Sequence, residues 1–167
     1  MFKDAILFNQ DISSWDVGAG RDFAVMFDGA IDFNQDISNW DVSQSTDFSL
    51  MFSGASSFNQ DISSWDVSQG TDFYGMFDGA STFDQDLGPW DITQAEDIEL
   101  MLASSALSVA NYDATLIGWA AQSPPNDLTL GASGLAYCSG ETARNALLST
   151  YGWTINGDQL DCGGNGS

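Results

Sequence analysis

Carboxylates are the side chains of this chain that could do chemistry, because 24 of its 167 residues are Asp or Glu. Twelve aspartates recur every 25 residues in three series. The first series is Asp11, Asp36, Asp61 and Asp86; the second is Asp16, Asp41, Asp66 and Asp91; the third is Asp22, Asp47, Asp72 and Asp97. Hard oxygen ligands of this kind suit Ca²⁺, and a pair of carboxylates can also hydrolyse a glycoside.

The charge balance excludes several classes of function. Only 3 residues are Lys or Arg, so the net charge is -21, and there is no His. A nucleic-acid binder needs a basic surface, which this chain lacks. The lack of His removes His-based triads and His-ligated zinc. No apolar run reaches the ~18 residues that span a bilayer, so we expect no membrane insertion.

The aspartates are positioned by an internal repeat. Units of 25 residues begin at Met1, Met26, Met51 and Met76, and a fifth unit begins at Met101 and then loses the pattern. Such regularity predicts coils that stack on one another around a shared core. Because the chain opens at the start of a repeat, we expect it to be part of a longer polypeptide. Residues 1–102 therefore form four repeats plus the start of a fifth.

Two short elements are expected in each coil. In the second unit, Ile37, Trp40 and Val42 have L-x-x-L-x-L spacing, which predicts a short strand with these side chains inside. Phe48, Met51 and Phe52 have i, i+3, i+4 spacing, which predicts a short helix capped by Thr46 or Asp47. The repeat is thus an α/β solenoid coil. The Trp series is expected in the core, although a stacking platform for sugars is the alternative. The Trp series is Trp15, Trp40, Trp65 and Trp90.

The tail differs from the repeats, and we expect an α/β C-terminal cap over residues 103–162. Helices are predicted at 111–122 and 141–151, the second with Ser139 as a possible N-cap, and strands at 127–130, 135–138 and 153–156. Residues 163–167 have the composition of a linker. Cys138 and Cys162 are expected to form a disulfide in an oxidising compartment. Two free thiols in an intracellular protein are the alternative.

The segments FNQDISSWDVS, FNQDISNWDVS and GASSFNQDISSWDVSQGTDFYGMF resemble the BspA-like leucine-rich-repeat surface proteins of bacteria. The resemblance implies a right-handed solenoid, a secreted or cell-surface location, and a role in adhesion or partner binding. It implies no enzymatic activity. The chain departs from the family pattern on the predicted helical side. Gly20, Ser45, Gly70 and Ala95 stand where the family favours Val, and Phe23, Phe48, Phe73 and Ile98 stand where it favours Met.

The second aspartate series is the candidate binding site. Each member lies between an inward Trp and an inward Val or Ile, so period-two alternation points it outward. Hydroxyls and an amide share this face, which predicts contact with a protein or glycan on a cell or matrix surface, and possible Ca²⁺ ligation by the four aspartates. A solvated acidic face is the alternative. The candidate residues are Asp16, Asp41, Asp66, Asp91, Ser14, Asn39, Ser64, Ser43, Ser68 and Thr93.

The other repeated polar residues have structural interpretations. The first aspartate series is expected to bond backbone N–H groups in a turn, and the third to cap helices. Neighbouring Asn and Gln residues, such as Asn34 and Gln35, are expected to form amide ladders. Identical residues in every coil make a uniform surface, so we expect no catalytic residue and no required cofactor. A structural spacer, stiffened by Ca²⁺ or not, and a carbohydrate-active enzyme are the other two hypotheses.

Overall fold

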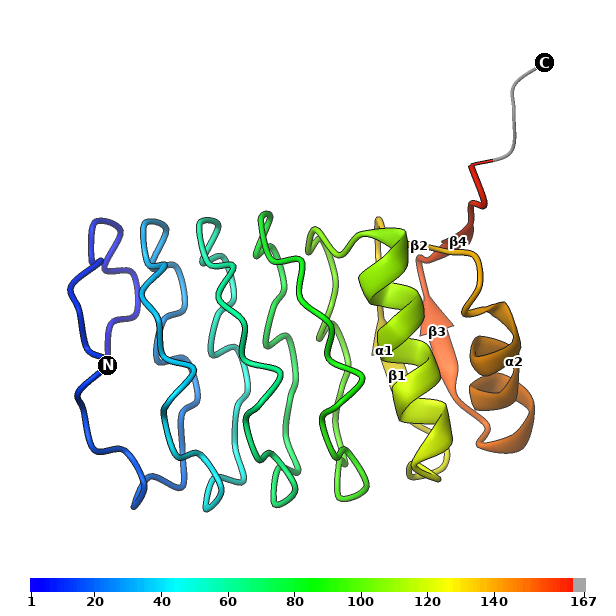
Figure 1. Cartoon of the computed structure of the whole chain (residues 1–167), viewed down its shortest axis with the longest axis horizontal. Coiled ribbons are helices and arrows are strands. Elements are labelled where there is room, and N and C mark those ends of the chain that lie inside the picture. Colours follow the sequence, from blue (N-terminus) through cyan, green and yellow to red (C-terminus); the bar gives the residue numbers. More distant parts are fainter. Residues whose placement is uncertain (164–167) are drawn as a thin grey trace.

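The computed structural model describes residues 1–163, so most of the predicted linker at 163–167 lies outside the described residues. Successive 25-residue units lie side by side as coils of one winding chain (Figure 1). We call them the first coil (1–25), second coil (26–50), third coil (51–75) and fourth coil (76–100). A region containing helices follows the fourth coil, at the opposite end from Met1. Within residues 1–163, no helix combines the length and apolar character needed to cross a membrane.

Backbone hydrogen bonds run from each coil to the next. Alternate backbone N–H groups donate to the carbonyl of the residue 24 positions later in the chain. Phe23 donates to Asp47, Val25 to Ser49 and Phe27 to Met51, each at 2.9 Å. The same pattern links the second coil to the third through Phe48 and Leu50, and the third coil to the fourth through Phe52. Parallel β-bridges join the third aspartate series, Asp22 to Asp47 to Asp72 to Asp97. The coils therefore share a parallel, β-like ladder.

This ladder lies on the segment that was predicted to be helical, which corrects the assignment of elements within the coil. No α-helix is assigned between Met1 and Ser108, and the segment 36–43 contains turns and irregular backbone but no strand. The reason is a left-handed residue within the apolar segment: φ is 53° at Val25, 55° at Leu50 and 57° at Gly75. A residue in this region interrupts a right-handed helix. The helix-capping role predicted for Thr46 or Asp47 is therefore wrong.

Aromatic side chains fill the interior in registered stacks. Phe27, Phe52 and Phe77 stack with ring centroids 5.6 and 5.7 Å apart and nearly parallel planes. The indole N–H groups of Trp40, Trp65 and Trp90 donate to carbonyls of the preceding coil, at 3.2, 3.1 and 2.9 Å. All three indoles are buried, so the predicted core role is confirmed for them. Trp15 of the first coil is 40% exposed, so the core role is not confirmed for it.

Amide side chains form a second connection between coils, as predicted. The Oδ1 atom of Asn9 accepts the backbone N–H of Asn34 at 3.0 Å and the side-chain amide of Gln35 at 2.8 Å. Asn34 repeats this arrangement with Asn59 and Gln60. Each coil therefore satisfies polar groups of its neighbour through side chains as well as through the backbone.

The tail contains two helices and four short strands: α1 (Val109–Ala121), β1 (Thr129–Gly131), β2 (Ala136–Tyr137), α2 (Glu141–Thr150), β3 (Thr154–Asn156) and β4 (Gln159–Leu160). β1 pairs with β3 and β2 with β4, both in parallel. The sequence predicted both helices and the first three strands to within a few residues, and missed β4. α1 begins at its N-cap Ser108, while the N-cap of α2 is Gly140 rather than the predicted Ser139.

α1 takes the place of one side of a further coil (Figure 1). Trp119 donates its indole N–H to the carbonyl of Leu87 in the fourth coil at 2.9 Å. Trp90 makes the equivalent bond to Ile62 in the third coil. Asn111 donates to Asp84 as Gln35 donates to Asn9. On the other side, Leu130 of β1 bridges to Ile98 and extends the parallel ladder into the tail. The tail thus continues the contacts of the coils with different secondary structure.

The buried indole hydrogen bonds lead to a stability prediction. We expect Trp65→Phe to lower the free energy of unfolding by about 2 kcal/mol, because it shrinks a buried ring and removes one of the two donors to the carbonyl of Ile37, leaving only the backbone N–H of Trp40. Urea denaturation measures this change. The control is Trp15→Phe, the same substitution at a ring that is 40% exposed, for which the loss should stay below about 1 kcal/mol. Equal losses in the two variants would contradict this account of the core.

Candidate functional site

One local structure accounts for all three aspartate series. In every coil, the Oδ1 atom of the aspartate accepts the backbone N–H of the residue two positions later. Asp36 accepts from Ser38 at 2.9 Å, Asp41 from Ser43 at 3.1 Å, and Asp47 from Ser49 at 2.9 Å. This arrangement is an Asx turn. The same bond is made by Asp11, Asp16, Asp22, Asp61, Asp66, Asp72, Asp86, Asp91 and Asp97.

The three predicted roles have different outcomes. The turn role of the first series is confirmed by these hydrogen bonds. The third series makes the same turn and not a helix cap, so that prediction is wrong. The members of the second series are exposed, as expected, but they lie in turns, and each uses one carboxylate oxygen within its own coil. The other oxygen, Oδ2, is the one that the turn leaves for a ligand.

Hydrogen bonding outweighs repulsion between stacked carboxylates in the second series. The hydroxyl and the amide of Ser43 donate to Asp41 and hold the pKa of its carboxyl below its usual range. Ser68 lowers the pKa of Asp66 in the same way, although the charge of Asp41 acts in the opposite direction. Both side chains are therefore ionised at neutral pH, and the face is negatively charged.

The third series differs in its degree of burial. Burial raises the pKa of Asp72, and the hydrogen bond from the Tyr74 amide acts against this rise. The charges of Asp47 and Asp97, one coil to either side, also raise the pKa. Desolvation therefore decides the direction of the pKa shift at Asp72, whereas hydrogen bonds decide the direction of the pKa shift at Asp41 and Asp66.

The other candidate residues of the predicted face divide into three groups. Ser43 and Thr93 donate their hydroxyls to Asp41 and Asp91, each at 2.7 Å. Asn39 donates its side-chain amide to the carbonyl of Ser13 at 3.0 Å, so it joins coils. Ser14 and Ser64 are exposed on the surface. The predicted face is thus a row of turns whose aspartates are already hydrogen-bonded within their own coil, with exposed polar side chains beside them.

A polar groove gathers part of this strip. A cavity of about 320 Å³ is lined by Arg21, Ser43, Gln44, Thr46, Asp66, Ser68 and Gln69. Three of these residues, Ser43, Asp66 and Ser68, belong to the predicted site. The sequence analysis missed the other four, although one signal was present: Arg21 is one of only three cations and occupies the position of Thr46 and Thr71 in the next coils.

The calcium prediction has little geometric support in the described residues. Within residues 1–163, no group of three or more acidic, His or Cys side chains lies close enough together to hold a metal ion. The second series supplies one carboxylate per coil, and its Oδ1 atom is already bonded to the turn. Ca²⁺ takes six to eight oxygen ligands, several of them usually carboxylates. We therefore assign no metal ligand among Asp16, Asp41, Asp66 and Asp91.

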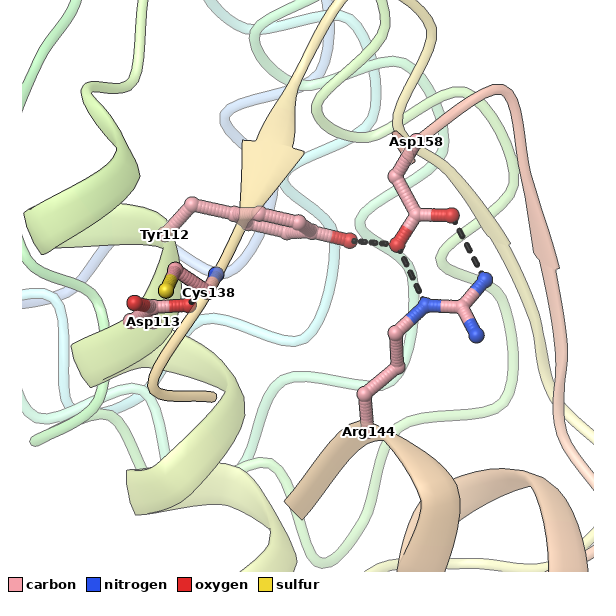
Figure 2. Close-up of polar contacts among 5 residues, drawn as sticks. All are labelled: Tyr112, Asp113, Cys138, Arg144 and Asp158. Carbon is pink, nitrogen blue, oxygen red and sulfur yellow. Dashed lines mark hydrogen bonds and ion pairs between the residues drawn. The ribbon is translucent and has the colours of Figure 1, made fainter. Parts of the chain in front are cut away.

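A buried polar cluster lies in the tail (Figure 2). Asp158 accepts two hydrogen bonds from Arg144, at 2.6 and 2.7 Å, and one from the hydroxyl of Tyr112 at 3.1 Å. The guanidinium also lies over the ring of Tyr137, 4.7 Å from its centroid. Burial raises the pKa of Tyr112, so its hydroxyl stays protonated at neutral pH. The cluster ties α1, β2 and α2 to the turn before β4.

A second buried carboxylate secures the disulfide region. Asp113 in α1 accepts the backbone N–H of Cys138 at 2.9 Å, and the backbone N–H and hydroxyl of Ser139, both at 2.8 Å. Cys138 is bonded to Cys162, so the predicted disulfide is confirmed. These contacts satisfy Asp113 and Asp158 completely, and the geometry gives both residues a structural role.

The class that this geometry defines is a repeat protein of stacked 25-residue coils with a disulfide-bonded tail. A family model described as "Mycoplasma protein of unknown function, DUF285" matches residues 1–115. The chain therefore belongs to the DUF285 family. The match covers all four coils and the first part of α1. Comparisons with curated proteins and with solved structures gave no match to this chain.

The opposite pKa shifts in the two series can be tested by titration. We expect the carboxyl of Asp41 to titrate below the ordinary Asp value of about 3.9 and that of Asp72 above it. Charged Asp41 stabilises the fold above its unfolded pKa, and this contribution is lost as the pH falls through its folded pKa. Asp72 has the reverse sign: protonation favours the fold, and the benefit is lost as the pH rises through its raised pKa.

Carbon-detected NMR of the side-chain carboxyls measures both values in one sample. Asp41→Asn and Asp72→Asn identify the two signals, and they keep an Oδ1 acceptor for the turn. An Asp41 pKa above that of Asp72 would contradict the assignment of hydrogen bonding and burial as the dominant causes.

Proposed function

We propose that this chain is a non-enzymatic surface or adhesion module that binds a glycan or protein through the face carrying the second aspartate series. The observation that carries this proposal is the polar groove that joins Ser43, Asp66 and Ser68 to Arg21. It makes one part of an otherwise uniform face chemically distinct. Ligand sites are concave, and a small number of convergent polar groups fixes the orientation of the ligand.

The proposed setting is the outside of a bacterial cell. The disulfide between Cys138 and Cys162 supports an oxidising compartment, since such bonds rarely persist in a reducing cytosol. The resemblance to BspA-like surface proteins supports the same location. We also propose a right-handed, leucine-rich-repeat-like solenoid for residues 1–102 and a capping role for residues 103–162. The continuation of the coil contacts by Trp119 and Leu130 supports that cap.

The absence of catalysis is also part of the proposal. A glycosidase needs two carboxylates whose environments move their pKa values apart. Asp41 and Asp66 have the same turn, the same serine donors and pKa values lowered by the same causes. Asp113 and Asp158 are fully engaged in the tail. The geometry of these carboxylates favours binding over bond cleavage.

A structural spacer is the second candidate, and the uninterrupted ladder of backbone bonds between coils favours it. A spacer needs stiffness along the stack and no ligand. The two functions differ in one respect that can be measured: a binding module depends on the charge of the second series, and a spacer does not.

The deciding variant is Asp41→Asn/Asp66→Asn. Asparagine keeps the Oδ1 acceptor of the turn and removes the charge, so the fold should persist. We expect at least a tenfold loss of affinity for a partner found on glycan and extracellular-matrix protein arrays, since a charge-assisted hydrogen bond contributes about 1.5–3 kcal/mol. Biolayer interferometry measures the affinity, and circular dichroism checks the fold.

The matched control is Asp36→Asn/Asp61→Asn, which makes the same chemical change in the same type of turn in the first series. It should leave partner binding unchanged. Equal effects of the two double variants would point to bulk charge and contradict a site on this face. No partner on either array, with the chain folded, would favour the spacer.

A further inference from the structure

We propose that the groove beside Arg21 binds one acidic sugar residue, a ring that carries both a carboxylate and hydroxyls. In this arrangement, the guanidinium of Arg21 pairs with the sugar carboxylate, and Asp66 accepts hydrogen bonds from the sugar hydroxyls. The inference rests on the proposed function, because it names the ligand class of the same face.

Among the Lys and Arg side chains of residues 1–163, Arg21 is the one without an ion pair or a hydrogen bond. Within residues 1–163, the ion pairs are Lys3 with Asp28 and Arg144 with Asp158. The guanidinium of Arg21 makes neither an ion pair nor a hydrogen bond in that part of the chain, even though the chain has 24 acidic residues. An arginine is a planar donor that matches a carboxylate through two parallel hydrogen bonds. Because the guanidinium of Arg21 has no carboxylate partner in so acidic a protein, we infer that it pairs with an anionic group on the ligand.

The backbone at Arg21 is held in place by the second coil. Its carbonyl accepts the backbone N–H of Thr46 at 3.0 Å and the hydroxyl of Ser45 at 3.2 Å. The ladder continues at the next residue, where Asp22 bridges to Asp47. The Cα of Arg21 is therefore fixed at the edge of the groove, and its exposed side chain lines the groove from that point.

The repeat makes Arg21 unique among equivalent positions. The corresponding residues of the later coils are Thr46, Thr71 and Glu96. A threonine at this position uses its hydroxyl between coils: Thr71 donates to the carbonyl of Thr46 at 3.2 Å. Arg21 replaces that short side chain with a long cationic one. The groove is thus the place where the symmetry of the face is broken.

The lining of the groove favours a sugar over a protein anchor. All seven lining residues are polar, and none is aromatic or aliphatic. Protein interfaces depend on aromatic or apolar anchors buried in fitted pockets, and such an anchor would find no apolar surface here. Gln44 and Gln69 add amide donors and acceptors that suit ring hydroxyls. A volume of about 320 Å³ is sufficient for one monosaccharide unit.

Asp66 selects against simple anions. Its carboxylate lies in the same lining as Arg21, and hydrogen bonds hold its pKa low, so it is charged at neutral pH. Inorganic phosphate or sulfate would be repelled by the charge of Asp66 and by the net charge of -21. Unlike a sugar, such an ion has no set of hydroxyl groups that could donate hydrogen bonds to the Asp66 carboxylate. A sugar acid presents its carboxylate at one point of the ring and hydroxyl donors at the others. It satisfies both groups at once.

The test compares two ligands that differ only in the carboxylate: methyl β-D-glucuronide and methyl β-D-glucoside. Each is titrated into the ¹⁵N-labelled full chain, and the amide signals of Gln44, Thr46 and Gln69 are followed. We expect the dissociation constant of the glucuronide to be at least about tenfold lower, which corresponds to about 1.4 kcal/mol. Arg21→Gln should remove this preference and leave the fold intact, because the side chain is exposed.

Lys3→Gln is the matched control, because it removes one positive charge from a residue outside the groove lining. It should keep the preference for the glucuronide. Equal affinity for the two sugars, or a preference that survives Arg21→Gln, overturns the inference. If an array identifies a protein partner and neither sugar shifts the groove amides, the sugar inference fails while the proposed function stands. If the Asp41→Asn/Asp66→Asn variant also binds normally, the proposed function fails with it.

Discussion

The hydrogen bonds that pass from each coil to the next are the constraint on which the rest of this structure depends. The backbone N–H groups of Phe48, Leu50 and Phe52 donate to the following coil. The backbone N–H of Asn34 and the indole N–H of Trp65 donate to the preceding one. A coil of another length would misalign all of these bonds at once. This explains why the 25-residue spacing continues from Met1 to Met101 without an insertion. It also explains why the tail reproduces the same bonds through Trp119 and Leu130 before the chain changes its secondary structure.

The acidity of the chain follows from this constraint. A coil must reverse direction several times while keeping its outward-facing backbone groups for the neighbouring coils, and an Asx turn does this within three residues. All twelve repeated aspartates make that turn. Stacking places like charges in columns, and the repulsion is visible in the way Asp41 raises the pKa of Asp66. Local hydrogen bonds from Ser68 outweigh it. These turns alone give half of the 24 acidic residues a structural role, and the second oxygens of the second series form the charged face.

The features that the sequence predicted correctly are those that depend on composition and period. The repeat, the buried tryptophans, the amide ladder through Asn34, the turn role of Asp36 and the helices of the tail all follow from residue type and spacing. The position of the parallel ladder does not. Apolar spacing at Phe48, Met51 and Phe52 fits a helix as well as a turn, and the left-handed backbone at Leu50 has no sign in its side chain. The groove also escaped prediction, because Arg21 and Asp66 come from different coils and meet only through their stacking.

The most direct test of this account is amide hydrogen exchange of the native chain, measured by NMR. The N–H groups of Phe48, Leu50 and Phe52 donate to the third coil and its continuation, while that of Ser43 donates to an exposed carboxylate within its own coil. If the bonds between coils hold the structure together, the first three amides exchange only through the global opening of the stack, with protection close to the free energy of unfolding. Ser43 then exchanges faster by orders of magnitude. Exchange of Phe48, Leu50 and Phe52 at the rate of Ser43 would contradict the account.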